Sequence, residues 1–294
     1  MPPIFLIMYI GRFAPSPSGR LHFGSLVCAL GSYLVARKRQ GRFLLRIEDL
    51  DRSRCNDFFT KTIIKELEIL GFDYDDKPYI QSLHQDNYFD AIDLLLKNKQ
   101  AYYCNCTRAK LKEKECDCNL HQDTIDLNKP YSIRYKIPST LESFFIDELQ
   151  GKVENTYTKS NITLKRADNI IAYNLACVVD DILQGVTQVV RGCDLIEITT
   201  TQRALYKSLG HEPISYLHLP LIMADSEHKL SKQNHATPVL DTDTPENLLL
   251  KALKILNVNC ENLHHQMSCQ KILQIAVDNF NFDSLNRKNR IFLD

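Results

Sequence analysis

The chain has 294 residues and a mass of 33.9 kDa, which suits two domains or one large α/β domain with an insertion. Apolar residues make up 44% and charged residues 24%, and this composition excludes a disordered chain, a collagen and a disulfide-rich miniprotein. The 36 basic and 36 acidic side chains cancel, which excludes a uniformly basic nucleic-acid-binding protein but not a local basic patch.

The N-terminal ten residues are apolar but carry neither a basic n-region nor a small-residue cleavage site. They predict a buried strand rather than a signal peptide, and Met8 is a second candidate start. No apolar run approaches the ~20 residues that span a bilayer, so no membrane association is expected. Ten cysteines without a signal peptide indicate a reducing, cytoplasmic location, where clustered cysteines bind metal more often than they form disulfides.

The first hundred residues predict the opening of a nucleotide-binding α/β unit. Leu26, Leu30 and Leu34 share one face of a predicted helix, and the apolar run that follows suits a buried parallel strand. The predicted order is strand 9–13, a Pro/Ser/Gly loop, helix 24–39, strand 43–47, and helices near 58–70 and 87–96. This order opens many nucleotide-binding domains.

The rest of the chain divides by composition. Residues 101–165 are richer in Cys, Lys and Thr and predict short strands and loops. Apolar patterns then predict strands at 170–181 (ending in two acids), 188–191 and 217–223, followed by helices at 245–256 and 270–279. We therefore expect an α/β domain in two halves, 1–100 and 166–235, with an insert at 101–165 and a helical C-terminal region at 236–294.

The first motif, GRFAPSPSGRLHFGS at residues 11–25, leads from a strand into a helix start. Free backbone N–H groups at a helix N-terminus favour phosphate, and Gly24 allows close backbone approach. His22 could donate a hydrogen bond to a phosphate. The alternative is a Pro- and Gly-rich turn that caps a helix.

Residues 21–25 (LHFGS) resemble the HIGH motif of class I aminoacyl-tRNA synthetases, and residues 11–19 and 46–51 (RIEDLD) resemble elements of its glutamyl branch. The resemblance implies a Rossmann-type catalytic domain and a ligase activity. It implies catalytic roles for His22 and Gly24 and places ATP at His22, Gly24 and Ser25. It places glutamate at Arg12, Phe13, Ala14, Pro15, Ser16 and Glu48.

The chemistry of these residues agrees with such a site, because a carboxylate such as Glu48 can hold an α-ammonium and Arg12 can grip a carboxylate. The alternative for Glu48 and Asp49 is a solvated loop after the strand, or ion pairing with Arg52.

A second motif, KLSKQ at residues 229–233, resembles the KMSKS loop of the same class. The resemblance implies that Lys232 stabilises the triphosphate, with Lys229 supporting it and Ser231 in the ATP site. This string alone is common in solvated loops, and it gains weight from following the His22 motif in the expected order.

Tyr173 and Arg191 match a tyrosine and an arginine that face the substrate side chain in the glutamyl branch. An arginine there would select glutamate over glutamine, because an amide would leave its charge buried and unpaired. The alternatives are a core aromatic for Tyr173 and, for Arg191, a structural ion pair with Asp180, Asp181 or Asp194.

Four cysteines, Cys104, Cys106, Cys116 and Cys118, form two C-x-C pairs that could close a tetrahedral Zn²⁺ site. His121 is a competing ligand for the second half, and free surface thiols are the alternative. Relatives that act on queuosine carry the first C-x-C and complete it with a downstream tyrosine and cysteine. This chain departs there, because no tyrosine occurs between Cys106 and Tyr131.

The length after the second motif distinguishes branches of the class, because residues 234–294 are too few for the anticodon-binding region of a full glutamyl-tRNA synthetase. HFGS at 22–25 and KQN at 232–234 resemble the short glutamyl-Q tRNA(Asp) synthetase family, over about residues 9–256. That resemblance implies tRNA-independent activation of L-glutamate with ATP and Mg²⁺, then transfer to the queuosine base in the anticodon of tRNA(Asp), by a monomer.

The basic run Arg108, Lys110, Lys112 and Lys114 is a candidate tRNA contact, although interleaved acids also fit a solvated face. Two rival functions remain: a truncated synthetase that charges a tRNA 3′ end, and a non-catalytic zinc-bearing tRNA-binding module.

Overall fold

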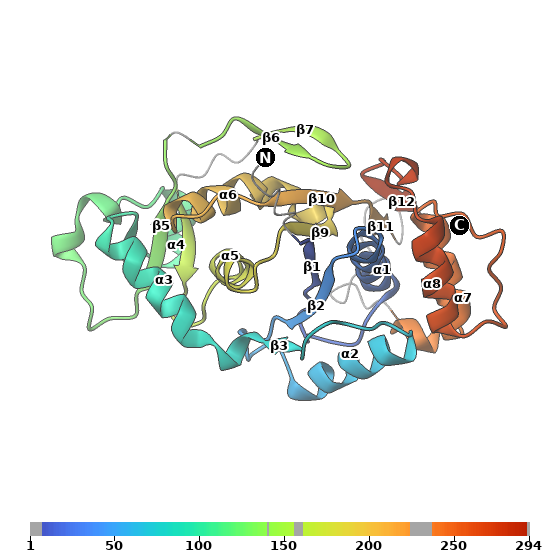
Figure 1. Cartoon of the computed structure of the whole chain (residues 1–294). Coiled ribbons are helices and arrows are strands. Elements are labelled where there is room, and N and C mark those ends of the chain that lie inside the picture. Colours follow the sequence, from blue (N-terminus) through green and yellow to red (C-terminus); the bar gives the residue numbers. More distant parts are fainter. Residues whose placement is uncertain (1–7, 140, 156–160, 224–236, 293–294) are drawn as a thin grey trace.

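The structure is a computed structural model that describes residues 8–139, 141–155, 161–223 and 237–292. Its centre is built of short parallel strands (Figure 1). One sheet has the order β1-β2-β3, and β9 pairs with β10 in a second. The bounds are β1 Ile10–Phe13, β2 Arg42–Ile47, β3 Tyr79–Ile80, β9 Gln188–Gly192 and β10 Ser215–Leu219.

The two sheets meet at β1 and β9. The Thr187 N–H donates to the Ile10 carbonyl (2.9 Å), and the Ser32 hydroxyl contacts the carbonyls of both Arg12 (2.9 Å) and Val190 (3.5 Å). Because neighbours advance together along both strands, β1 and β9 run parallel and the overall order is β3-β2-β1-β9-β10. From β1 the chain adds β2 and β3 on one side, and later adds β9 and β10 on the other. Ligands of open α/β sheets bind at such a switch point, here between β1 and β9.

Helices cover both faces of this sheet (Figure 1). Helix α1 (Phe23–Lys38) links β1 to β2 and is covered in turn by α7 (Pro245–Ile255) and α8 (Cys269–Asn279). Gly31 lets α1 approach the sheet closely, since a Cβ there would lie 2.5 Å from Leu219 Cδ1. Helix α5 (Tyr173–Leu183) lies against the opposite face.

Most of the insert lies at one end of the elongated molecule and α7 and α8 lie at the other, whereas its hairpin at residues 144–154 lies against β10 near the centre (Figure 1). The insert contains an antiparallel sheet of β4 (Ala101–Cys104), β5 (Ser132–Lys136) and β8 (Asn161–Lys165), and the hairpin of β6 (Phe144–Asp147) and β7 (Gly151–Glu154). The remaining elements are α2 Asp57–Ile69, α3 Gln85–Lys97, α4 Arg108–Glu113, α6 Thr199–Ser208, β11 Leu221–Met223 and β12 Arg290–Phe292.

The structure confirms the five predicted helices as α1, α2, α3, α7 and α8. The strand predicted at 170–181 is wrong, because most of it belongs to α5. Residues 175–181 of this helix are all buried, so the segment is a continuous apolar run ending in two acids, a pattern that a buried strand also gives. The predicted strand at 217–223 is two strands, divided at Pro220, which has no N–H to donate.

None of the helices within the described ranges is long and apolar enough to cross a membrane.

Candidate active site

A cavity of about 650 Å³ opens at the carboxyl ends of β1 and β9. It is lined by every predicted ligand-binding residue that the structure describes: Arg12, Phe13, Ala14, Pro15, Ser16, His22, Gly24, Ser25, Glu48, Tyr173 and Arg191. Lys229, Ser231 and Lys232 lie outside the described residues. The fold therefore brings together residues that are up to 179 positions apart.

His22 caps the N-terminus of α1 at the edge of this cavity. Its Nδ1 accepts a hydrogen bond from the Ser25 N–H (3.3 Å), and its backbone is extended, as is usual for a capping residue. The first turn of α1 contains no acidic side chain. The start of a 16-residue helix thus faces the cavity, and its N–H groups and dipole favour a phosphate there.

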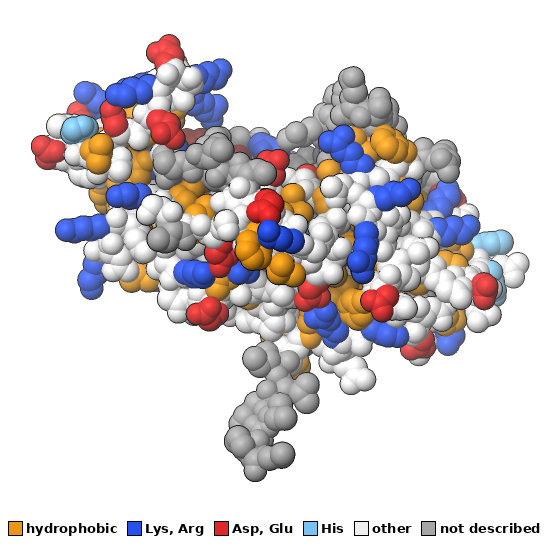
Figure 2. Space-filling model, turned by 90° about the horizontal axis from the view of Figure 1, so that it is seen from above, with side chains coloured by type: hydrophobic (Ala, Val, Ile, Leu, Met, Phe, Trp, Pro, Cys, Tyr) orange, Lys and Arg blue, Asp and Glu red, His pale blue; other side chains and the backbone are white. Residues whose placement is uncertain are grey.

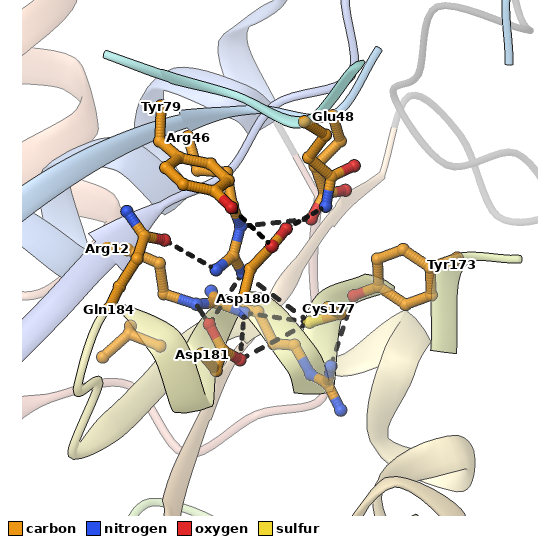
Figure 3. Close-up of polar contacts among 12 residues, drawn as sticks. Arg12, Arg46, Glu48, Tyr79, Tyr173, Cys177, Asp180, Asp181 and Gln184 are labelled. Carbon is orange, nitrogen blue, oxygen red and sulfur yellow. Dashed lines mark hydrogen bonds and ion pairs between the residues drawn. The ribbon is translucent and has the colours of Figure 1, made fainter. Parts of the chain in front are cut away.

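Two buried arginines beneath the cavity share one carboxylate (Figure 3). Arg12 of β1 and Arg46 of β2 leave the same face of the sheet and reach Asp181 of α5, at 3.1 and 2.7 Å. Burial opposes ionisation of Asp181, but the two guanidinium groups prevail and lower its pKa. Arg12 therefore already has an anionic partner in the protein.

Glu48, at the end of β2, is a buried carboxylate whose negative charge is only weakly balanced by neighbouring positive charges. Its Oε1 lies 3.9 Å from Arg46 Nε, and its side chain is 9% exposed. Burial raises the pKa of Glu48 to about 7, and the positive charges of Arg46 and Arg12 offset this only in part. The alternative pairing with Arg52 is confirmed for Asp49 (3.7 Å) but is wrong for Glu48, and Arg52 also pairs with Asp57 (3.0 Å).

Arg191, on β9, is a buried cation that faces the cavity without a carboxylate partner among the described residues. Its Nη1 donates to the Tyr173 hydroxyl (3.3 Å), and its Nη2 donates to Thr199 Oγ1 (2.9 Å) and the Leu195 carbonyl (3.2 Å). The alternative of an ion pair with Asp180, Asp181 or Asp194 is wrong. A buried, uncompensated arginine in a cavity is suited to an anionic ligand.

Sequence reasoning missed the residues behind Arg191. His218 of β10 and Asp147 of β6 are buried and hydrogen-bonded to each other, and His218 also contacts Arg191. The available signal was a histidine inside the apolar strand YLHLPLI. Asp147 gave no comparable signal, because it lies 71 residues from its partner.

The four cysteines of the insert converge. Their Sγ atoms all lie within 4.8 Å of one another, with Cys104 and Cys116 at 3.4 Å and Cys106 and Cys118 at 3.5 Å. A tetrahedral Zn²⁺ with Zn–S bonds of ~2.3 Å places its sulfurs ~3.8 Å apart, so the donor set fits zinc. His121 is not part of this group. Burial raises the pKa of the Cys104 thiol to about 11.

Comparison with known proteins agrees with this geometry. The model of the family described as tRNA synthetases class I (E and Q), catalytic domain, matches residues 10–293. The chain is 43% identical over 292 residues to glutamyl-Q tRNA(Asp) synthetase of Escherichia coli (strain K12), covering 95% of this chain and 93% of that protein. The chain belongs to the glutamyl-Q tRNA(Asp) synthetase family.

A second member of this family, from Photobacterium profundum, is 40% identical over 293 residues, covering 97% of this chain and 92% of that protein. Among solved structures, a glutamate tRNA ligase from Elizabethkingia meningosepticum in complex with its amino acid superposes with a TM-score of 0.79 at 24% identity. This match covers 96% of the present chain and 66% of the ligase chain, and it shows the shared fold. The predicted class I synthetase fold and family are thus confirmed.

Proposed function

We propose that this protein activates L-glutamate with ATP without tRNA, and then transfers the glutamate to the queuosine base in the anticodon of tRNA(Asp). The observation that carries the proposal is Arg191, a buried cation without a carboxylate partner in the described structure, in a cavity that also contains Glu48 and the start of α1. The names of the relatives, glutamyl-Q tRNA(Asp) synthetases, support the same substrates.

The cavity offers complementary groups for the three charged parts of glutamate. The side-chain carboxylate would bind Arg191 and the Tyr173 hydroxyl, which lie 3.3 Å apart, and the α-ammonium would bind ionised Glu48. The α-carboxylate would then face the start of α1, together with the α-phosphate of ATP. Residues 12–16 line the cavity between these groups.

The reaction would proceed in two displacements. An oxygen of the α-carboxylate attacks the α-phosphorus and pyrophosphate leaves, giving glutamyl-adenylate. A queuosine hydroxyl then attacks the activated carbonyl carbon and AMP leaves. We assign His22, Gly24 and Ser25 to the ATP site, and Lys229, Ser231 and Lys232 to the leaving pyrophosphate, where positioning and cations lower the barrier. Mg²⁺ would enter with the ATP phosphates.

We further propose that Cys104, Cys106, Cys116 and Cys118 hold one Zn²⁺. Its chemistry would be structural, because four thiolates leave no open coordination position. The catalytic domain would comprise residues 1–100 and 166–235, with the insert at 101–165 and the helical region at 236–294. We expect a cytoplasmic monomer that grips tRNA through its backbone phosphates.

The test is transfer of labelled glutamate, with ATP, to bulk tRNA from cells with and without queuosine. We expect label only in the queuosine-containing pool, and glutamate-dependent pyrophosphate exchange without tRNA. Equal labelling of both pools would show a synthetase that charges 3′ ends. An absence of both labelling and exchange would show a non-catalytic module.

A further inference from the structure

The cation that we assign to the glutamate side chain is held from behind by a histidine. Arg191 Nε donates to His218 Nε2 at 3.1 Å, and the guanidinium also lies 5.1 Å from the centre of the Tyr216 ring. His218 is completely buried on β10, the neighbour of β9, and is directly opposite Arg191 in the strand register. The imidazole therefore holds the Nε side of the guanidinium, while Tyr173, Thr199 and Leu195 accept from its two Nη atoms.

The hydrogen bonds determine where the single proton of a neutral His218 resides. An arginine can only donate, so Nε2 must accept and the proton must lie on Nδ1. Nδ1 lies 2.6 Å from Asp147 Oδ2, which accepts that proton. Burial, reinforced by the positive charge of Arg191, lowers the pKa of His218 and keeps it neutral.

Asp147 is itself held rigidly. It ends β6, and its Oδ1 accepts the backbone N–H groups of Leu149 (3.0 Å), Gln150 (2.9 Å) and His218 (3.2 Å). The side-chain amide of Gln150 (Nε2) donates to the His218 carbonyl (2.9 Å), so a hydrogen bond joins the β6–β7 turn to β10. Oδ2 is left to face the imidazole.

We propose that Asp147 and His218 form a positioning relay that fixes Arg191 for the carboxylate of the amino acid, and that this relay determines the preference for glutamate over glutamine. A carboxylate in direct contact would have fixed Arg191 equally well but neutralised it. The neutral imidazole holds the guanidinium while leaving its charge available to the substrate. The claim on specificity rests on the proposed function, and the claim on the relay does not.

Asp147→Asn gives a sharp test, because the three backbone donors require an acceptor at the Oδ1 position. The amide NH₂ would then occupy the Oδ2 position and donate to Nδ1, so the imidazole proton would move to Nε2. A protonated Nε2 can no longer accept the hydrogen bond from Arg191 Nε. We expect the KM for glutamate in pyrophosphate exchange to rise about 10- to 100-fold, with the KM for ATP unchanged and discrimination against glutamine reduced.

Glu148→Gln is the matched control, because it makes the same acid-to-amide change in the same turn but its side chain pairs with Arg39 (2.6 Å). His218→Gln can still present a carbonyl to Arg191 and should retain more glutamate selectivity than His218→Phe. Equal glutamate KM and selectivity in Asp147→Asn and Glu148→Gln would overturn the role in specificity.

The tautomer and charge of His218 can be measured by ¹⁵N NMR of histidine-labelled protein. The variant His218→Gln identifies the His218 resonances among those of the nine histidines. We expect a neutral Nδ1–H tautomer in the native protein and Nε2–H in Asp147→Asn. A charged imidazole or an Nε2–H tautomer in the native protein would overturn the relay. If exchange is absent but the tautomers are as expected, the proposed function fails and the relay stands.

Discussion

Arg191 and Glu48 are buried charges of opposite sign that the protein leaves largely uncompensated in one cavity. Charges in such places destabilise a fold unless a ligand completes them. Arg12 and Arg46 differ, because both guanidinium groups contact the carboxylate of Asp181. We therefore propose that the charges of Arg191 and Glu48 are completed by the substrate.

Arg191→Ala tests the first of these charges. Removal of the guanidinium deletes the charge-assisted contact to the substrate carboxylate, so we expect the KM for glutamate to rise about 10- to 100-fold and discrimination against glutamine to weaken. Pyrophosphate exchange with each amino acid measures both. Arg203→Ala is the control, because Arg203 pairs with Glu142 outside this cavity. Unchanged selectivity would assign the role to another group.

The proposed contact of Glu48 with the α-ammonium predicts that glutamate binding depends on pH. Only its ionised form can hold an ammonium, and its pKa is raised to about 7. The KM for glutamate should therefore rise about tenfold for each unit below pH 7, and should be nearly independent of pH in Glu48→Gln. A flat profile in the native protein would separate Glu48 from the ammonium. Glu148→Gln should keep the native profile.

The same shift predicts a change in stability in the absence of glutamate. The unfolded chain ionises Glu48 near the ordinary value of 4.5, whereas the folded protein retains the proton to about pH 7. The folded state therefore loses stability as pH rises between these values. Glu48→Gln removes that cost, so its advantage should be near zero at pH 4 and reach roughly 3 kcal/mol above pH 7. Denaturant unfolding at both pH values measures it.

At the scale of elements, the cysteine cluster joins β4 to the segment that follows α4. We expect elemental analysis to find about one zinc per chain. Chelation or Cys104→Ser should lower the melting temperature, because structural metal sites contribute directly to folding. Cys260→Ser is the control, since Cys260 lies outside the cluster. A metal-free protein with native stability would contradict the assignment.

Elements that carry local motifs were predictable from the sequence, and contacts between distant elements were not. The loop before α1 and the strand β2 contain their own signals, so about half of the residues that line the cavity could be named in advance. Helix α5 has the sequence pattern of a strand because its consecutive residues 175–181 are all buried, and a short apolar run does not distinguish a buried helix from a buried strand. The pairings of Asp147 with His218 and of β11 with β12 depend on topology, which no local pattern encodes.

At the scale of the whole molecule, zero net charge means that tRNA must be attracted by local patches. Figure 2 shows the far end of the insert as a projecting lobe that carries both basic and acidic side chains. Arg108, Lys110, Lys112 and Lys114 are exposed on and after α4, and Lys114 pairs with Asp117 (2.7 Å). The lobe lies at the end of the molecule remote from α7 and α8 (Figure 1).

This arrangement predicts that binding of tRNA and activation of glutamate can be separated by mutation. The double change Lys110→Glu and Lys112→Glu should weaken transfer to tRNA and reduce the slope of log affinity against log salt by about one for each lost phosphate contact. It should leave pyrophosphate exchange unchanged, because these residues do not line the cavity.

The control is the same double change at Lys251 and Lys254 on α7. It makes an equal change in net charge at the opposite end of the molecule, so it separates local attraction from the effect of total charge. Equal losses of transfer in the two double variants would show that net charge alone governs the encounter, and an unchanged transfer rate in the α4 variant would show that its lysines are a solvated face.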